Sequence, residues 1–279
     1  MRRPSLKRQI KLAIDAQLKI GQSKYHAKKE LRRLHQPGQR WLDGIYSIET
    51  AQNTRKLSIA FSEWIKVSHG CRWLDECRQY ATEYLVFREG QGDSPNTLKN
   101  RRAALRRLYN DPTVANDYQA PKRRRQDIKR SRYAAIRDAH FSTERNKDLV
   151  VFCLGTGLRR HEVAAVRPED VFREGDKVYI FVAQGKGGKK RTVQAWGPYS
   201  DNIWSIARAR DGQERIFERV HSHADIQALR RQFAQAKYLE EAHQTFDIKN
   251  YNKKALSEVS IQLGHGPKRR DVILRGYVR

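Results

Sequence analysis

The segment LVVFCLGTGLRRHEVAAVRPEDV, at residues 149–171, constrains the fold of this chain more than any other. An apolar run over residues 149–154 leads into a Gly-Thr-Gly turn, and the residues after the turn have the spacing of an amphipathic helix. Arg159 and Glu162 are three positions apart and therefore share one face at the start of that helix. Because the free N–H groups of a helix start and a guanidinium group both attract oxyanions, the segment predicts an oxyanion clamp.

The charge of the chain indicates what such a clamp binds. The 57 Lys and Arg residues outnumber the 31 Asp and Glu residues, which gives a formal net charge of +26 over 279 residues. Self-repulsion on this scale is tolerated when a polyanion neutralises it, and nucleic acid is the usual polyanion. A generic basic protein, such as a ribosomal or chromatin component, is the alternative. At 38% hydrophobic residues the chain can build cores, and its length suits two domains.

The cysteines and the apolar runs predict an intracellular protein. Cys71, Cys77 and Cys153 form no CxxC pair, so neither a disulfide framework nor a zinc knuckle is expected. No apolar run approaches membrane-spanning length, and the N-terminal MRRPSLKRQIKL lacks the apolar core of a signal peptide. We therefore expect a cytoplasmic, nucleoid-associated protein with no metal and no cofactor.

The N-terminal part of the chain is predicted to be helical. Residues 5–36 have apolar side chains at helical spacing with Lys and Arg on the opposite face, and Pro37-Gly38 ends this pattern. We interpret residues 1–50 as a basic helical extension that faces DNA, in preference to a membrane or calmodulin-like element. The helical period continues over residues 51–112, which we expect to form a helical DNA-binding domain.

A cationic helix is predicted at SPNTLKNRRAALRRLYN, residues 94–110. Ser94 can cap this helix and Pro95 fits its first turn, while four apolar residues line one face. The other face carries five cations without a carboxylate partner, which favours phosphate contacts over a merely solvated surface. These cations are Lys99, Arg101, Arg102, Arg106 and Arg107.

A basic loop separates this helix from the second half of the chain. Residues 113–132 include PKRRRQDIKRSR and show no apolar periodicity, which predicts a linker that lies along DNA. The second domain is expected at residues 133–279. It is mostly helical by pattern, but KVYIFVAQGKGGKKRTVQAW alternates β-branched and aromatic residues around a glycine-rich turn, which predicts a β-hairpin. The linker cations assigned to DNA contact are Lys122, Arg123, Arg124 and Arg125.

Several features of the second half indicate little when each is taken alone. The arginine–glutamate pair of the clamp segment could be an exposed ion pair of small energetic value. Lys186, in QGKGGKKR, could be a loop cation, because the spacing does not match a Walker A loop. Arg230 lies near the start of a predicted helix, and His265 follows the end of another, where histidine is more often a cap than a catalyst.

The order of these features along the chain is far more specific. That order is TGLRRHEV at 156–163, GKGGKKR at 185–191, ALRRQFA at 228–234, LGH at 263–265 and finally Tyr277. Throughout its second half the chain thereby resembles the tyrosine recombinases, the phage-type integrase family. The style of SPNTLKNRRAALRR and LSEVSIQLGH is similar to integrases of integrative conjugative elements and related mobile DNA.

The resemblance implies a fold. It predicts a mostly α-helical protein with a small β-hairpin or sheet and the two-domain tyrosine recombinase architecture. A helical, SAM-like core-binding domain, for which residues 51–112 are the candidate, would join an α+β catalytic domain in a C-shaped clamp on DNA.

The resemblance also implies cleavage and rejoining of DNA through a 3′-phosphotyrosyl intermediate, without metal or ATP. Tyr277 would be the nucleophile, and Arg159 and Arg230 would clamp the phosphate. Lys186 would protonate the leaving 5′ oxygen, while His265 would hydrogen-bond the phosphate and assist proton transfer. The full set of implied site residues is Arg159, Glu162 (which would orient the site), Lys186, Gln227, Arg230, His265 and Tyr277.

Two departures from the family pattern stand out. Gln227 takes the place of the usual histidine, and a glutamine can hydrogen-bond a phosphate oxygen but cannot carry a proton near pH 7. His223 is an alternative source of that function, although the turn of helix between them favours simple replacement. Tyr277 follows His265 by 12 positions, longer than the common spacing, and only two residues follow it. The tail that family members often dock on a neighbouring protomer is therefore expected to be absent or truncated.

The implied partners are double-stranded DNA at core recombination sites and further copies of the chain, as a homotetramer on two DNA sites. A directionality factor or a host DNA-bending protein could join them. We expect integration or excision of a mobile element. Two alternatives stay open: the same chemistry used by a resolvase or a type IB topoisomerase-like DNA-relaxing enzyme, and a degenerate homologue that only binds and bridges DNA.

Overall fold

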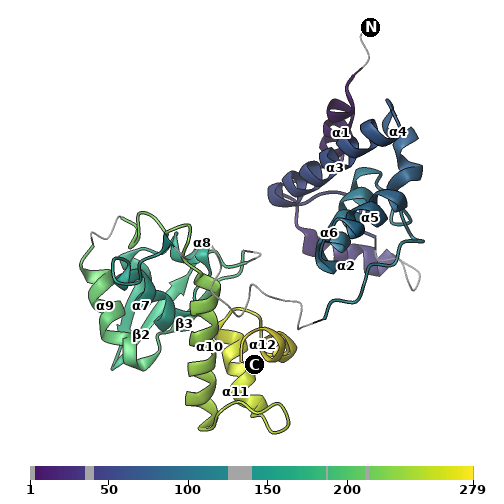
Figure 1. Cartoon of the computed structure of the whole chain (residues 1–279). Helices are drawn as coiled ribbons and strands as arrows, with labels where there is room; N and C mark the ends of the chain where they lie inside the picture. Colours follow the sequence, from purple (N-terminus) through teal and green to yellow (C-terminus); the bar gives the residue numbers. More distant parts are fainter. Residues whose placement is uncertain (1–3, 35–40, 125–139, 187, 211–213, 279) are drawn as a thin grey trace. The chain divides into compact units, whose positions relative to one another are not determined.

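The computed structural model describes residues 4–34, 41–124, 140–186, 188–210 and 214–278. The chain divides into two units, Met1–Asp127 and Ile128–Arg279 (Figure 1). Each unit has its own hydrophobic core. The described part of the first unit contains helices, whereas the second combines helices with one small antiparallel sheet. The prediction of a mostly helical, two-domain protein is confirmed.

Serine caps fix helix starts in the N-terminal unit, and those of α3 and α6 are examples. The Ser47 hydroxyl accepts a hydrogen bond from the Thr50 N–H at 3.2 Å, and the Ser94 hydroxyl accepts one from the Thr97 N–H at the same distance. Pro95 occupies the first turn after Ser94, so the predicted cap of this helix is confirmed. The elements of this unit are α1 (Leu6–Asp15), α2 (Lys24–Leu34), α3 (Ile48–Ser68), α4 (Leu74–Cys77), the 3-10 turn η1 (Arg78–Tyr80), α5 (Ala81–Gly90) and α6 (Pro95–Leu108).

The N-terminal core includes residues that were expected to lie outside it. Phe61 of α3 and Leu85 of α5 are fully buried, and Ile10 and Ile14 of α1 belong to the same cluster with Ile45. The interpretation of the first 50 residues as an extension separate from the helical domain was therefore wrong for α1. Its apolar face packs on the core, as the helical spacing of those isoleucines permits.

The predicted helix over residues 5–36 is in fact two helices. The chain leaves α1 early because it pairs with a later segment, and the Lys19 N–H donates to the Ile45 carbonyl at 2.9 Å. Gly21 then adopts a φ of 87°, and α2 follows. None of the residues of α2 is buried, so its cations remain exposed to solvent. Pro37-Gly38, the predicted break, lies outside the described residues.

The first part of the predicted linker is packed. Val114, Ala115 and Tyr118 are buried in the N-terminal core, and Arg106 of α6 donates to the Val114 carbonyl at 3.0 Å. The prediction of an unpacked linker from residue 113 onwards was therefore wrong for its beginning. Arg125 and the rest of the predicted linker lie outside the described residues.

The C-terminal unit contains a three-stranded antiparallel sheet in the order β1-β2-β3. The predicted hairpin is confirmed as β2 and β3, with Val182 opposite Arg191, and β1 pairs with the other edge of β2. The elements are α7 (Lys147–Thr156), α8 (Arg160–Val163), η4 (Pro168–Asp170), β1 (Val171–Glu174), β2 (Lys177–Val182), β3 (Arg191–Gln194), η5 (Gly197–Tyr199), α9 (Ser200–Arg208), α10 (Ile226–Ala242), α11 (Lys253–Gln262) and α12 (Arg270–Gly276).

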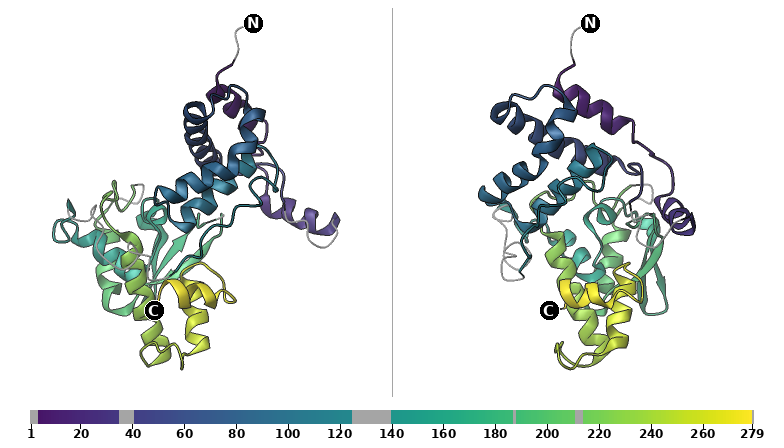
Figure 2. Two further views of the ribbon diagram at one scale, coloured as in Figure 1. Left: turned by 45° about the vertical axis from the view of Figure 1, so that its right-hand side comes forward. Right: turned by 90° about the vertical axis from the view of Figure 1, so that its right-hand side faces the viewer.

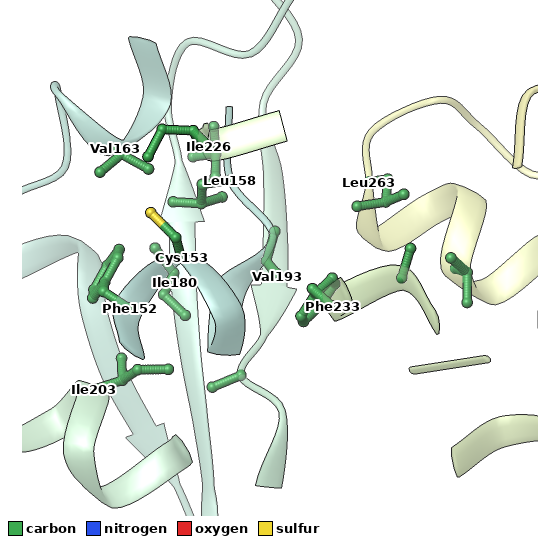
Figure 3. Close-up of a cluster of buried hydrophobic side chains, with 14 of the residues drawn as sticks. Phe152, Cys153, Leu158, Val163, Ile180, Val193, Ile203, Ile226, Phe233 and Leu263 are labelled. Atoms are coloured by element: carbon green, nitrogen blue, oxygen red, sulfur yellow. The ribbon is translucent and has the colours of Figure 1, made fainter. Parts of the chain in front are cut away.

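The apolar run that begins the clamp segment is the buried middle of α7. Phe152 and Cys153 of this helix lie in one cluster with Ile180 of β2 and Val193 of β3, and Phe233 brings α10 to the same cluster (Figure 3). The helices α10, α11 and α12 pack against one another in turn (Figure 2). The helix predicted after the turn is α8, which is only four residues long.

Gly157 sets the path of the chain from α7 to Arg159. It adopts a φ of 57°, which an L-residue rarely takes, and a Cβ at this position would collide with the ring of Phe233. The glycine therefore ends α7 where it packs on α10, and the chain turns so that Arg159 reaches the Leu263 carbonyl at the end of α11.

The described residues also bear on two simpler expectations. None of the helices within them is both long and apolar enough to cross a membrane. Cys71, Cys77 and Cys153 are free thiols, and burial raises the pKa of both Cys77 and Cys153 to about 12. These two thiols are therefore poor nucleophiles at neutral pH.

Candidate active site

The phenol of Tyr277 is the meeting point of three other side chains. Gln227 donates from Nε2 to the phenol oxygen at 3.2 Å, and Arg230 donates to it from Nε at 3.3 Å. The Nε2 atom of His265 lies 3.4 Å from the same oxygen. The structure thus brings together four of the residues that the motif order selected, from α10 and from the ends of α11 and α12.

Arg230 is buried, and main-chain carbonyls compensate its lost hydration. It is 1% exposed and donates to the carbonyls of Gly157 and Leu263 in addition to Tyr277. Burial lowers the pKa of Arg230, and the interaction with Tyr277 opposes the shift. An arginine so placed remains charged, because its ordinary pKa is far above neutrality.

Arg159 and Arg230 converge on a single acceptor. Nη2 of Arg159 donates to the Leu263 carbonyl at 3.1 Å, and Nη2 of Arg230 donates to the same carbonyl at 2.5 Å. Each guanidinium group has five N–H donors and so retains some for a ligand. Two fixed guanidinium groups side by side next to Tyr277 are the geometry of an oxyanion clamp.

The surroundings of Tyr277 favour its ionised form. Burial alone would raise the pKa of this phenol, but the charge of Arg230 and the hydrogen bonds from Arg230 and Gln227 outweigh burial and lower the pKa. The charge of Arg159 acts in the same direction. A phenol with a lowered pKa is easier to convert into a nucleophile.

His265 is held beside the phenol by its own main chain. Gly264 and Gly266 adopt positive φ angles of 69° and 85°, and the His265 N–H donates to the Ser260 carbonyl at 2.8 Å. Burial lowers the pKa of His265 to about 4, and the charge of Arg230 adds to the shift. The imidazole is therefore neutral at pH 7 in the protein alone, and a neutral imidazole can accept a proton.

Glu162 lies at the centre of a buried ion-pair network. Its side chain is fully buried and accepts hydrogen bonds from the Arg159 N–H at 2.7 Å and from Nη1 of Arg159 at 3.0 Å. Arg191 donates to both carboxylate oxygens, each at 2.8 Å. Burial alone would raise the pKa of Glu162, but these arginine contacts lower it to about 2. A carboxylate held so firmly in its charged form orients Arg159 and does not exchange protons.

Arg191 is a site residue that the sequence analysis missed. It ends the motif GKGGKKR, where it looked like one more cation of a basic turn. Its partner Glu162 is 29 positions away, so no local spacing links the two residues. The available signal was the glutamate of TGLRRHEV, which needs a second cation besides Arg159 if it is buried.

Lys186 lies in the turn between β2 and β3. It is exposed and makes no hydrogen bond or ion pair with other described residues, while Gly187 next to it lies outside them. Its charge contributes to the lowered pKa of His265, which puts the ammonium group within electrostatic reach of the imidazole. An exposed ammonium group on a hairpin turn is available to a ligand.

His223 does not take the place of Gln227. Its ring lies 5.5 Å from the rings of both His140 and His221, in a cluster that precedes α10. Gln227 itself contacts Tyr277.

The cations of α6 are more engaged than their sequence suggested. Arg101 pairs with Asp93 at 2.6 Å and also donates to the Tyr84 hydroxyl at 2.8 Å. The argument that these cations have no carboxylate partner was therefore wrong for Arg101. Lys99 is exposed and has no partner among the described residues, so it is the α6 cation most available to phosphate.

Three further arginines of α6 donate to protein acceptors. Arg102 donates to the Tyr118 carbonyl at 2.6 Å, and Arg107 donates to the Leu42 carbonyl at 2.7 Å. Arg106, as described above, holds the Val114 carbonyl. These side chains stabilise the loops around α6, which limits how freely they can turn to a phosphate. Among the residues after α6 that the structure describes, up to residue 124, the exposed cations are Lys122, Arg123 and Arg124.

Comparison with known proteins shows what this fold is. No family model matches the sequence, and no curated protein matches it. Among solved structures, the XerH site-specific recombinase bound to palindromic difH substrate, in a post-cleavage complex, matches with a TM-score of 0.55 and 17% identity. That match covers 95% of this chain and 90% of that chain.

A second solved structure also matches over most of the chain at low sequence identity. The Tn1549 transposon integrase in complex with circular intermediate DNA has a TM-score of 0.51 and 14% identity, and the match covers 81% of this chain and 89% of that chain. The chain therefore has the fold of the tyrosine recombinases, as the order of its motifs predicted.

Proposed function

We propose that this protein is a site-specific DNA recombinase, which cleaves and rejoins double-stranded DNA through a covalent 3′-phosphotyrosyl intermediate. One observation carries the proposal: Gln227, Arg230 and His265 all lie within 3.4 Å of the phenol oxygen of Tyr277, beside a second arginine. The net charge of +26 supports a nucleic-acid substrate. The DNA held in the XerH and Tn1549 integrase structures supports it further.

Cleavage begins with the attack of Tyr277 on the scissile phosphorus. A bond forms between the phenol oxygen and phosphorus, and the bond between phosphorus and the 5′ oxygen breaks. The phenol proton passes to His265, which is neutral before DNA binds because its pKa is about 4. The lowered pKa of Tyr277 reduces the cost of removing that proton.

The two arginines stabilise the charge that develops during this attack. The pentacovalent transition state gathers negative charge on the non-bridging oxygens, and Arg159 and Arg230 direct their remaining N–H groups at them. Gln227 donates one more hydrogen bond without changing its protonation. A preorganised donor such as either arginine is worth about 2.7–4 kcal/mol of the activation barrier.

Lys186 completes the reaction by protonating the departing 5′ oxygen. In religation the 5′ hydroxyl returns its proton to Lys186 and attacks the phosphotyrosyl group, while His265 returns a proton to Tyr277. The covalent bond to the phenol conserves the energy of the phosphodiester, so no ATP is consumed.

The remaining partners belong to the same proposal. The exposed cations of α2, together with Lys99, Lys122 and Arg123, would contact DNA phosphates outside the catalytic unit. We assign the protein to integration or excision of a mobile element. It would act as a homotetramer on two core sites, with a directionality factor or a host DNA-bending protein as auxiliary partner.

A nicked suicide substrate tests this function. The protein first selects its own binding site from a random duplex library. The selected duplex is then nicked beside the cleavage position, so that the short fragment with the freed 5′ hydroxyl diffuses away and religation cannot occur. A covalent protein–DNA adduct that Tyr277→Phe abolishes, while DNA binding persists, supports the proposal. Binding without any adduct would instead indicate a degenerate DNA-bridging homologue.

Two further measurements distinguish recombination from other uses of the same cleavage reaction. Strand exchange between two copies of the selected site supports recombination. Relaxation of supercoiled plasmid that lacks the site would instead indicate a topoisomerase-like enzyme.

A further inference from the structure

Arg191 connects three parts of the catalytic unit without touching Tyr277. It is the first residue of β3, and its two Nη atoms each donate to one oxygen of Glu162 at 2.8 Å. Its Nε donates to the carbonyl of Gln262, the last residue of α11, at 3.2 Å. Its side chain is 11% exposed. One guanidinium group therefore joins β3, α8 and the end of α11.

Two glycines pack directly on the Arg191 side chain. A Cβ at Gly185 would lie 2.9 Å from Nη1 of Arg191 and 2.6 Å from the Lys189 carbonyl oxygen. A Cβ at Gly264 would lie 3.1 Å from Nε of Arg191. All three distances are shorter than a real Cβ contact tolerates without displacement, so the main chain approaches the guanidinium group more closely than a residue with a Cβ could.

Each of these glycines is followed immediately by a residue of the proposed mechanism. Lys186 follows Gly185, and His265 follows Gly264. The Gly185 N–H also donates to the Lys189 carbonyl at 2.9 Å, which closes the base of the turn that carries Lys186. The position of the turn relative to Glu162 is thus set where Gly185 rests on Arg191.

A lysine in place of Arg191 cannot reproduce this arrangement. The planar guanidinium group matches both oxygens of a carboxylate and still directs Nε at a third acceptor, whereas an ammonium group is a point charge on a flexible stem. The Arg191→Lys variant therefore keeps the charge beside Glu162 but loses the surface on which the two glycines rest.

We propose that Arg191 is a positioning residue that fixes the Lys186 turn to the buried carboxylate of Glu162, so that Lys186 meets the departing 5′ oxygen. This inference rests on the proposed function. In the step concerned, the bond between phosphorus and the 5′ oxygen breaks and a proton moves from Nζ of Lys186 to that oxygen. Arg191 neither gives nor takes a proton.

A substrate with sulfur in place of the bridging 5′ oxygen isolates this step. A thiol ionises near pH 8.5, so a thiolate departs without a proton donor, whereas an alkoxide needs one. A general acid contributes about 10²–10⁴-fold to a rate. We expect Arg191→Lys to slow single-turnover cleavage of the ordinary nicked duplex by about tenfold to a hundredfold, at most the lower limit of that range, because Lys186 is displaced but still present. Cleavage of the sulfur-containing duplex should stay close to the wild-type rate.

Gly185→Ala provides an independent variant that changes no charged group. The added methyl group must displace either the turn or Arg191, so its profile should match that of Arg191→Lys: slow on the oxygen substrate and restored on the sulfur substrate. This variant also keeps the test decisive if Arg191→Lys does not fold, which near-ultraviolet circular dichroism would show.

Two controls bracket the result. Arg173→Lys alters an arginine of β1 that pairs with the exposed Asp201, and it should cleave both substrates at the wild-type rate. Arg159→Ala weakens the phosphate clamp, so sulfur should not restore its activity.

Equal losses on both substrates for Arg191→Lys and Gly185→Ala would overturn the inference, because Arg191 would then act on the clamp or on folding. Wild-type rates on both substrates would overturn it as well. Failure of the proposed function has a different signature, since the wild-type protein would then form no adduct with either duplex.

Discussion

Arg230 contacts Tyr277 in two ways, through a hydrogen bond of 3.3 Å from Nε to the phenol oxygen and through its guanidinium carbon, 5.6 Å from the ring centroid. The same arginine is buried between main-chain carbonyls, so its position is fixed before any ligand arrives. One charge therefore lowers the pKa of the proposed nucleophile and lies where the proposed mechanism needs a phosphate donor.

Replacement of Arg230 should lower the cleavage rate far more than replacement of Arg231. Arg230→Ala removes a transition-state donor and the main cause of the lowered Tyr277 pKa, so we expect at least about a hundredfold loss in cleavage rate. Arg231→Ala makes the same change in charge about 100° further around α10 and serves as the matched control. Single-turnover cleavage of the nicked duplex measures both variants, and near-normal cleavage by Arg230→Ala would rule out the clamp assignment.

The low pKa of His265 predicts a specific pH dependence. Its pKa is about 4 in the folded protein against an ordinary value of 6.5, so the folded state binds fewer protons than the unfolded state between these values. The free energy of unfolding should therefore fall as the pH drops from about 6.5 to about 4.

Two measurements check this prediction. Titration of the imidazole resonance by NMR, assigned with His265→Asn, should give a pKa well below 6.5. The urea midpoint of the wild type should fall more steeply over this pH range than that of His265→Asn. An imidazole that titrates at its ordinary pKa would contradict the role of His265 as a neutral proton acceptor.

Gln227 offers a test of the departure from the family pattern. An imidazole can donate the same hydrogen bond to Tyr277 and can also carry a proton, so Gln227→His should cleave at least as fast as the wild type. Gln227→Ala loses the donor, and an ordinary hydrogen bond of about 1 kcal/mol corresponds to about a fivefold loss in rate. Cleavage rates at several pH values measure both variants. A collapse of the Gln227→His rate would show that glutamine has a role of its own.

In the N-terminal unit, Lys99 and Arg101 should behave in opposite ways. Lys99→Ala removes an exposed cation, so the dependence of log affinity on log salt should become shallower by about one unit, with little effect on stability. Arg101→Ala breaks the contacts with Asp93 and Tyr84, and we expect a loss of roughly 1–3 kcal/mol in the free energy of unfolding. DNA titrations at several salt concentrations and urea denaturation separate the two effects. An unchanged salt dependence for Lys99→Ala would remove that residue from the DNA interface.

The sequence indicated which residues lie together in the candidate site better than it indicated the residues that hold them in place. Motif order identified Gln227, Arg230, His265 and Tyr277, which the structure gathers around one oxygen, because the motifs lie at helix and turn positions that local patterns reveal. Arg191 was missed because its meaning depends on a buried partner across the sheet.

The N-terminal unit shows the same limit. Periodicity correctly indicated helices, and the Ser94 cap was read from local chemistry. Periodicity did not show that α1 joins the core or that Arg102 and Arg107 hold main-chain carbonyls. Such contacts join residues that are far apart in the sequence, and local spacing does not reveal them.

The most direct test of the proposed mechanism is to identify the protein atom that becomes attached to DNA. The adduct formed on the nicked duplex is digested with protease and nuclease, and the modified peptide is sequenced by mass spectrometry. The proposed mechanism predicts a 3′-phosphate esterified to the Tyr277 oxygen, and no adduct with Tyr277→Phe. An adduct at another residue, or attachment through a 5′-phosphate, would contradict it.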